Sequence, residues 1–182
     1  MQLVIDRKFR GPAESANGGY TCGLLSSFMH GPAEVTLRLP PPLERPLEVV
    51  TDGPLELRDG EEVVAEAGAA ELEFDVPDPI AFDEAAAAAL PEGDRESVFP
   101  ECFVCGWTRE DGMRIYPGPV EGRDVFAATW VPRPELISSE FVWAALDCPG
   151  AYSLHFGQRG NPVLGRLAAR VEHLPHAGER CV

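Results

Sequence analysis

A single carboxylate, Asp147, lies inside a run of apolar residues that the sequence predicts to be a helix over residues 138–148. Ser138 and Ser139 are able to cap the first free amides of this helix, and Pro149 is expected to end it. A charged side chain in such a helix is rarely buried unless it is paired or used in chemistry. Asp147 is therefore predicted to be either a structural carboxylate held by a neighbouring group or a catalytic one.

A second carboxylate, Glu140, lies in the first turn of the same predicted helix. It is an alternative candidate for the catalytic carboxylate, in which case Asp147 would be structural. The simpler interpretation makes Glu140 an ordinary first-turn residue, because the helix dipole favours negative charge at that end.

An earlier helix, predicted over residues 17–29, has an unusually glycine-rich start. Asn17 is expected to cap it, and Gly18 and Gly19 follow. Two helical glycines cost about 1 kcal/mol each relative to alanine, so we expect that some neighbour requires a bare backbone there. The alternative is a flexible loop that precedes the helix.

Cys102 and Cys105 have the Cys-x-x-Cys spacing of half a zinc site. No second pair follows in the sequence, where Cys148 and Cys181 are isolated. A redox dithiol would be expected at a helix start in an alternating helix and strand pattern, which the sequence does not predict. We therefore predict no metal and no cofactor, and expect buried thiols that pack the start of the second half of the chain.

The composition limits the partners of the protein. Thirty acidic and fifteen basic side chains give the 182 residues a formal charge of -15, which repels phosphate backbones, so no nucleic-acid partner is expected. No run of about eighteen apolar residues exists, so no membrane partner is expected either. The five irregularly spaced cysteines and the absence of a signal-peptide pattern in residues 1–8 predict a cytoplasmic location.

The first half of the chain is predicted to consist mainly of strands. Alternating or β-prone runs occur at residues 3–10, 33–39, 47–50, 55–58 and 63–74. Asp-Gly dipeptides at residues 52–53 and 59–60 predict tight hairpin turns between the later strands. The expected first unit, residues 1–75, is thus a strand, a helix and an antiparallel sheet.

The second half is predicted to repeat this layout after a surface linker. The linker covers residues 76–101 and contains a short alanine-rich helix at residues 82–90. In the second unit, residues 102–182, we expect strands at residues 113–116, 125–130 and 163–171 around the helix that carries Asp147. This unit stops about two strands early, and an unfinished sheet edge favours a homodimer or a higher homo-oligomer.

Several short motifs have counterparts in a known group of proteins. They are Phe-Arg-Gly-Pro at residues 9–12, Asn-Gly-Gly at 17–19, Cys-Phe-Val-Cys-Gly at 102–106, Asp-Gly-Met-Arg-Ile at 111–115 and Trp-Ala-Ala-Leu-Asp at 143–147. The last three are similar to the Cys-x-x-Cys-Gly, Gly-Leu-x-Ile and Leu-x-Asp signatures of the hotdog-fold acyl-CoA thioesterase-like superfamily. The resemblance implies an α+β fold of two hotdog-like units, each an antiparallel sheet wrapped around a central helix, with the second unit incomplete.

The resemblance also implies hydrolysis of acyl-CoA or acyl-carrier thioesters. Asp147 would then be the base or the nucleophile, and amides near residues 18–19 or 139–140 would hold the oxyanion. The chain departs from the family where many members carry His-Gly-Gly, because residues 138–140 are Ser-Ser-Glu. The expected substrate-binding residues are Asn17, Gly18, Gly19, Ser138, Ser139, Arg166 and Arg170.

Three other functions remain open on the same residues. The acidic helix start favours an acyl-thioester binding protein without catalysis, and the fold also supports dehydratases or hydratases, for which an Asp and His pair would be expected. The unfinished sheet favours a structural or assembly role. Arg166 and Arg170 share one face of the predicted strand at residues 163–171 and are candidates for the phosphates of coenzyme A. Alternatives for that contact are Arg38, Arg114 and Arg159.

Overall fold

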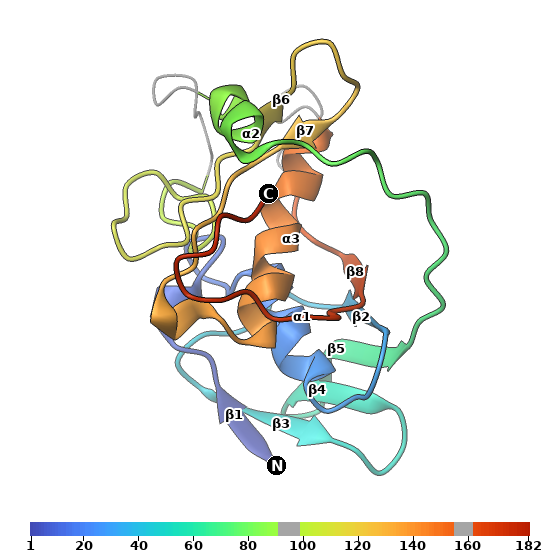
Figure 1. Cartoon of the computed structure of the whole chain (residues 1–182). Helices are drawn as coiled ribbons and strands as arrows, with labels where there is room; N and C mark the ends of the chain where they lie inside the picture. The colour runs from blue at the N-terminus through green and yellow to red at the C-terminus, as the bar shows by residue number, and fades with distance from the viewer. Residues whose placement is uncertain (91–98, 155–161) are drawn as a thin grey trace.

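The structure is a computed structural model that describes residues 1–90, 99–154 and 162–182. Within these residues the chain forms a six-stranded antiparallel sheet, a two-stranded sheet and three α-helices (Figure 1). The predicted α+β class is confirmed. None of the helices in the described part of the chain has the length and apolar character needed to cross a membrane.

The six-stranded sheet contains all the strands of the first half of the chain. Its spatial order is β1 (Gln2–Val4), β3 (Pro46–Val50), β4 (Leu55–Asp59), β5 (Glu62–Ala69), β2 (Ala33–Leu37) and β8 (Arg166–Ala169). The two Asp-Gly turns join β3 to β4 and β4 to β5, as predicted. Gly60 has a φ of +62°, a left-handed conformation that glycine adopts without steric cost.

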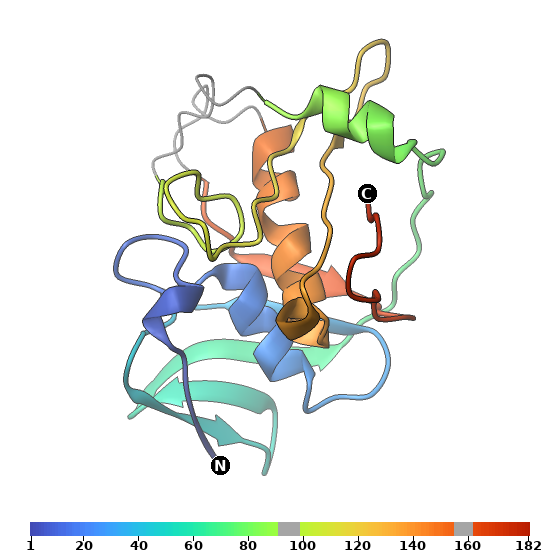
Figure 2. The same ribbon diagram turned by 60° about the vertical axis from the view of Figure 1, so that its left-hand side comes forward.

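Two helices lie on one side of this sheet. Helix α1 (Gly18–Ser26) packs against β2, β4 and β5, and helix α3 (Ser139–Ser153) packs against α1. Figure 2 shows α3 rising from α1 away from the sheet. The helix that carries Asp147 therefore contacts the helix that begins after Asn17.

The glycines of α1 make this helix contact unusually close. A Cβ atom on Gly19 would lie 2.6 Å from the carbonyl oxygen of Trp143, and one on Gly23 would lie 2.5 Å from the Cα atom of Glu140. Both distances are too short to allow a side chain at either position. The close approach of α3 is thus the reason for a bare backbone at the start and middle of α1.

Helix α3 does not end at Pro149, and that prediction is wrong. The helix runs on to Ser153 with the proline inside it. A proline in a helix interior removes one backbone hydrogen bond and costs about 3 kcal/mol. The turn beyond it carries Tyr152, whose side chain is buried, and this burial offsets part of the cost.

Four aromatic rings from different segments join the two halves of the chain. Phe9 stacks on Tyr20 of α1 with ring centroids 4.2 Å apart, and Phe103 meets Phe9 edge to face at 5.0 Å. Phe141 of α3 lies 5.6 Å from Tyr20 and 5.9 Å from Phe103. This cluster holds the segment of residues 102–106 against the starts of both helices.

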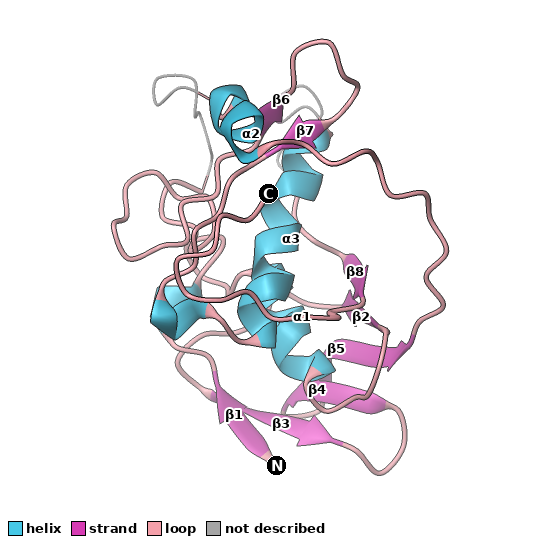
Figure 3. Cartoon of the chain, viewed as in Figure 1, coloured by secondary structure: helices cyan, strands magenta, loops and turns pink. Residues whose placement is uncertain are grey.

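The linker helix and the small sheet form a separate layer at the end of α3 (Figure 3). Helix α2 (Phe82–Ala88) packs against β6 (Gly118–Pro119) and β7 (Phe126–Ala127), which pair with each other. Ala85, Val120 and Ala127 form its buried core. This layer covers part of the surface far from the larger sheet.

Several predicted strands are shorter than expected or absent. Residues 113–116 do not form a strand, because Arg114 has a φ of +59° and cannot continue an extended backbone. The strand predicted at residues 3–10 ends at Val4, and residues 7–9 form a 3₁₀ helix whose start is capped by Asp6. The strands predicted at residues 63–74, 125–130 and 163–171 are shorter in the structure, where they are β5, β7 and β8. Near the C-terminus, Cys181 makes a single β-bridge to Trp130.

Candidate active site

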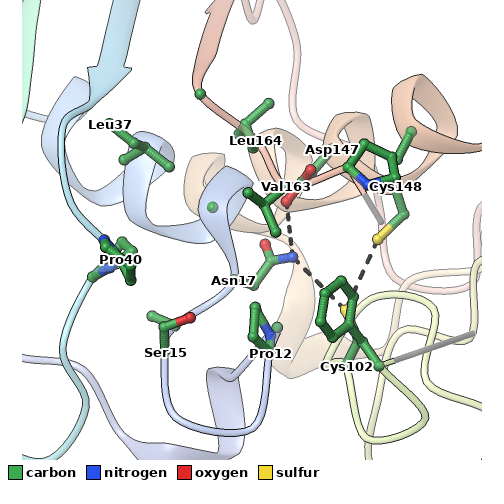
Figure 4. A pocket seen from close by; sticks show the side chains of 18 of the residues that line it. Pro12, Ser15, Asn17, Leu37, Pro40, Cys102, Asp147, Cys148, Val163 and Leu164 are labelled. Atoms are coloured by element: carbon green, nitrogen blue, oxygen red, sulfur yellow. Dashed lines mark hydrogen bonds between the residues drawn. The ribbon is translucent and has the colours of Figure 1, made fainter. Parts of the chain in front are cut away.

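A cavity of about 370 Å³ opens where α1 begins and the two helices meet (Figure 4). Its walls come from residues 11–18, residues 37–41, residues 162–165 and one face of α3, with further contacts from the segment around Cys102. The lining is mainly apolar, and its polar side chains are Ser15, Asn17, Arg38, Asp147 and a group of cysteines. The cavity therefore combines an apolar volume with a small set of reactive side chains.

Asp147 is joined to the first turn of α1 by two hydrogen bonds. Its Oδ2 atom accepts one from the backbone amide of Gly19 at 3.0 Å and one from the side-chain Nδ2 of Asn17 at 2.9 Å. Asn17 also caps α1, because its Oδ1 atom accepts a hydrogen bond from the amide of Tyr20 at 2.9 Å. The predicted cap is confirmed, and the same side chain holds Asp147.

The surroundings of Asp147 change its acidity. Burial of the carboxylate raises the pKa of Asp147 to about 6, while the hydrogen bonds from Gly19 and Asn17 act in the opposite direction. Such a carboxylate is mainly ionised at pH 7 and is a stronger base than an exposed aspartate. A pKa closer to the working pH suits a general base.

Gly18 lines the cavity at the amino end of α1. It is the first residue of α1, and the amide of a first helical residue has no acceptor within the helix. The amino end of a helix also carries partial positive charge. A carbonyl oxygen placed here would meet a hydrogen-bond donor and a favourable field, with Asp147 close by.

Three cysteines form the other polar part of the wall. The sulfur atoms of Cys102, Cys105 and Cys148 all lie within 4.8 Å of one another, and all three residues are buried. The Cys102 and Cys148 sulfurs are 3.9 Å apart. The thiols of Cys105 and Cys148 hydrogen-bond to the Cys102 sulfur, which lowers the pKa of Cys102.

The prediction that Cys148 is isolated is wrong, because its sulfur lies within 4.8 Å of those of Cys102 and Cys105. The Cys-x-x-Cys spacing identified two members of the group, but Cys148 is 43 positions beyond Cys105 in the sequence and comes from another element. The position of Cys148 directly after Asp147 is the one local signal, since a helix that directs Asp147 to the cavity also brings its neighbour near it. The packing of α3 against residues 102–106 was needed to complete the group.

The start of α3 lies outside the cavity wall. Ser138, Ser139 and Glu140 do not line it, although all three were candidate site residues. Ser138 occupies the cap position, but its hydroxyl donates to the Glu140 carboxylate at 2.7 Å instead of accepting a backbone amide. The expected side-chain cap is therefore wrong, because Glu140 competes for the hydroxyl.

The predicted phosphate-binding arginines also lie elsewhere. Arg166 pairs with Glu34 at 3.5 Å and Arg170 pairs with Glu172 at 3.0 Å, and neither lines the cavity. Arg38, one of the alternatives, does line it and pairs with Glu66 at 2.9 Å. Arg159 falls outside the described residues. Among the candidate arginines in the described residues, Arg38 is thus the one that lines the cavity, with its guanidinium paired to Glu66.

Searches with protein-family models, curated proteins and solved structures gave no match to this chain.

Proposed function

We propose that this protein hydrolyses acyl thioesters of coenzyme A or of an acyl carrier, with Asp147 as the general base. One observation carries the proposal: the Asp147 carboxylate meets the amino end of α1 at the wall of an apolar cavity. A base, a helix start and an apolar volume are the three parts that hydrolysis of a fatty acyl thioester needs.

The cavity supports an acyl substrate. Its volume of about 370 Å³ is in the range of small-molecule sites, roughly 300–1,000 Å³. Pro12, Leu37, Val163 and Leu164 give it apolar walls, and Arg38 supplies a cation. An acyl chain would be stabilised by burial against these side chains while the thioester carbonyl stays near Gly18.

The chemistry follows from this placement. Asp147 takes a proton from a water molecule, whose oxygen forms a bond to the thioester carbon. The Gly18 amide and the field of α1 stabilise the negative carbonyl oxygen of the tetrahedral intermediate, a contribution of about 10²- to 10³-fold for one such donor. The carbonyl then re-forms as the carbon–sulfur bond breaks, and the departing thiolate receives the proton held by Asp147.

The arrangement of the elements supports two hotdog-like units. Each long helix is followed by a strand, α1 by β2 and α3 by β8, and these two strands pair antiparallel with Val35 opposite Leu167. The two helices also pack on each other. A chain with two related units side by side would show this pairing of helix with helix and strand with strand.

Only one of the two units would contribute a catalytic carboxylate. Asp147 lies nine residues after the cap Ser138 (147 − 138), and the residue nine after the cap Asn17 is Ser26 (26 − 17). Ser26 is buried and its hydroxyl donates to the carbonyl of Gly23. A serine at this place cannot act as the base that Asp147 provides, so catalysis is assigned to the site at the start of α1.

A second candidate is an acyl-thioester binding protein without catalysis. The observation that favours it is that the Gly19 amide already donates to Asp147, so this amide is not free for an oxyanion. Hydrolysis must then use Gly18 or break the Gly19 bond. The same cavity would bind an acyl thioester in either case.

Two further parts of the proposal concern assembly and location. Strand β8 stands at one edge of the six-stranded sheet, which supports pairing with a second copy of the chain. All five cysteines are free, which supports a reducing cytoplasm. The molar mass in solution by light scattering tests the homo-oligomer.

The function is tested with a panel of short, medium, long and aromatic acyl-CoAs, with products identified by mass spectrometry. We expect release of the free acid and coenzyme A from at least one chain-length class. Binding of the panel without any turnover would support the non-catalytic protein instead. Hydration or dehydration of an unsaturated or hydroxylated acyl-CoA without thiol release would support a hydratase or dehydratase.

A further inference from the structure

We propose that Cys102, Cys105 and Cys148 form a binding site for a thiophilic divalent metal ion, with Zn²⁺ as the ion that fits it best. The three sulfurs come from two segments that are distant in the sequence, the segment of residues 102–106 and helix α3. An ion bound to the three sulfurs would link these two segments. The inference stands on the cysteine group alone and does not rest on the proposed hydrolysis.

The spacing of the sulfurs suits a tetrahedral ion. Zinc–sulfur bonds are about 2.3 Å long, so two sulfurs on one tetrahedral zinc are about 3.8 Å apart. The Cys102 and Cys148 sulfurs are 3.9 Å apart, and the whole group lies within 4.8 Å. Every sulfur separation in the group is thus at most about 1 Å longer than the separation on a tetrahedral zinc ion.

The backbone of residues 102–106 forms a tight turn. The amide of Gly106 donates to the carbonyl of Cys102 at 2.8 Å, and a Cβ on Gly106 would lie 2.3 Å from that carbonyl oxygen. The turn holds Cys102 and Cys105 with their sulfur atoms within 4.8 Å of each other, close enough for both to bind one ion.

A side chain outside the turn also contacts the Cys102 sulfur. The Nδ2 atom of Asn17 lies 3.9 Å from Cys102 Sγ and 2.9 Å from the Asp147 carboxylate. Figure 4 shows Asn17 between Asp147 and Cys102, and a contact from the Cys102 sulfur to that of Cys148, which follows Asp147 on α3. Such outer contacts orient the ligands of many metal sites.

The fourth position of the ion would face the cavity. All three cysteines line the cavity, and among the described residues the group contains three ligands and not four. A water molecule or a small thiol in the cavity would complete a tetrahedron. Zinc sites with three protein ligands and one exchangeable ligand have this composition.

Binding requires proton release and no change of oxidation state. Each thiol gives up its proton to the solvent as its sulfur bonds to Zn²⁺, so affinity falls at low pH. The alternative is a set of inert buried thiols. These two interpretations differ in metal content, which can be measured whether or not the protein is an enzyme.

The experiment is metal analysis of the full-length protein, purified under reducing conditions, incubated with zinc and passed through a desalting column. We expect about one zinc per chain in the wild type and in Cys22→Ala, a control that removes an equally buried thiol outside the group. Cys102→Ala and Cys148→Ala should each fall at least about tenfold below this ratio. Circular dichroism identifies any variant that has lost its fold.

Cobalt binding to the wild-type protein makes the test independent of the variants. Co²⁺ held by three thiolates gives intense charge-transfer absorption and visible bands typical of tetrahedral geometry, which zinc then displaces. Folded wild-type protein that retains no zinc and gives no such bands would overturn the proposal. Equal zinc loss in Cys22→Ala and Cys148→Ala, or a disulfide within the group in the reduced protein, would overturn it as well.

Discussion

The carboxylate of Asp147 on α3 accepts a hydrogen bond from the backbone amide of Gly19 on α1, with 3.0 Å between the two heavy atoms. This contact exists because the two helices approach at Gly19, where no side chain separates them. The same approach places the carboxylate beside the cap Asn17 and at the wall of the cavity. Helix packing and the candidate chemistry are thus set by one small region.

Substitution of Gly19 by alanine should destabilise the protein. The added Cβ would lie 2.6 Å from the carbonyl oxygen of Trp143 and 2.8 Å from Cβ of Asp147, so the helices must move apart. We expect a loss of about 1–3 kcal/mol in the free energy of unfolding, the usual cost of overpacking, measured by urea denaturation. Gly150→Ala is the matched control, since nothing lies within 4 Å of its Cβ position. It should be neutral or more stable by up to about 1 kcal/mol, and equal losses in the two variants would contradict this account.

Two substitutions of Asn17 separate its two roles. Asn17→Ala removes both the cap on the Tyr20 amide and the donor to Asp147, and should cost about 2 kcal/mol in the free energy of unfolding. Asn17→Ser keeps a capping oxygen but loses the donor to Asp147, so its cost should be smaller by about 1 kcal/mol. Urea denaturation at pH 7 measures both, and a serine variant as unstable as the alanine variant would exclude the capping role.

The strands and turns of the first half were predictable because their signals are local. Alternation over residues 33–37 and the two Asp-Gly turns act within a few residues, and so does the cap at Asn17. Local signals failed at Arg114 and Pro149. A left-handed Arg114 and a helix that continues through Pro149 depend on packing that no local pattern encodes.

The site was predictable in part for the same reason. Asp147 was identified as a charge in an apolar run, and Gly19 as a glycine that needed a close neighbour, but their contact joins positions 128 residues apart. The Cys148 contact with Cys102 spans 46 residues. Such pairs follow from the packing of α3 on α1, which single-sequence patterns do not contain.

A larger side chain at Ala151 should shorten the acyl chains that the cavity accepts. Ala151 lies one helical turn after Asp147 on α3 and lines the cavity. In Ala151→Phe we expect KM for long-chain acyl-CoAs to rise at least about tenfold, with a smaller change for the shortest substrates. The control is Leu146→Phe, at a position of the same helix that is 46% exposed and outside the cavity wall. Steady-state kinetics across chain lengths provide the measurement, and an equal rise in KM for every chain length would argue against an acyl cavity here.

Turnover of acyl-CoA by Asp147→Asn, compared with the wild type, tests the central claim most directly. The amide keeps the size of the side chain and an oxygen that can accept from Gly19, but it cannot take a proton from water. We expect the rate of acid formation, followed by mass spectrometry, to fall at least about 100-fold while the protein remains folded and still binds substrate. Full activity in Asp147→Asn would contradict the assignment of Asp147 as the base.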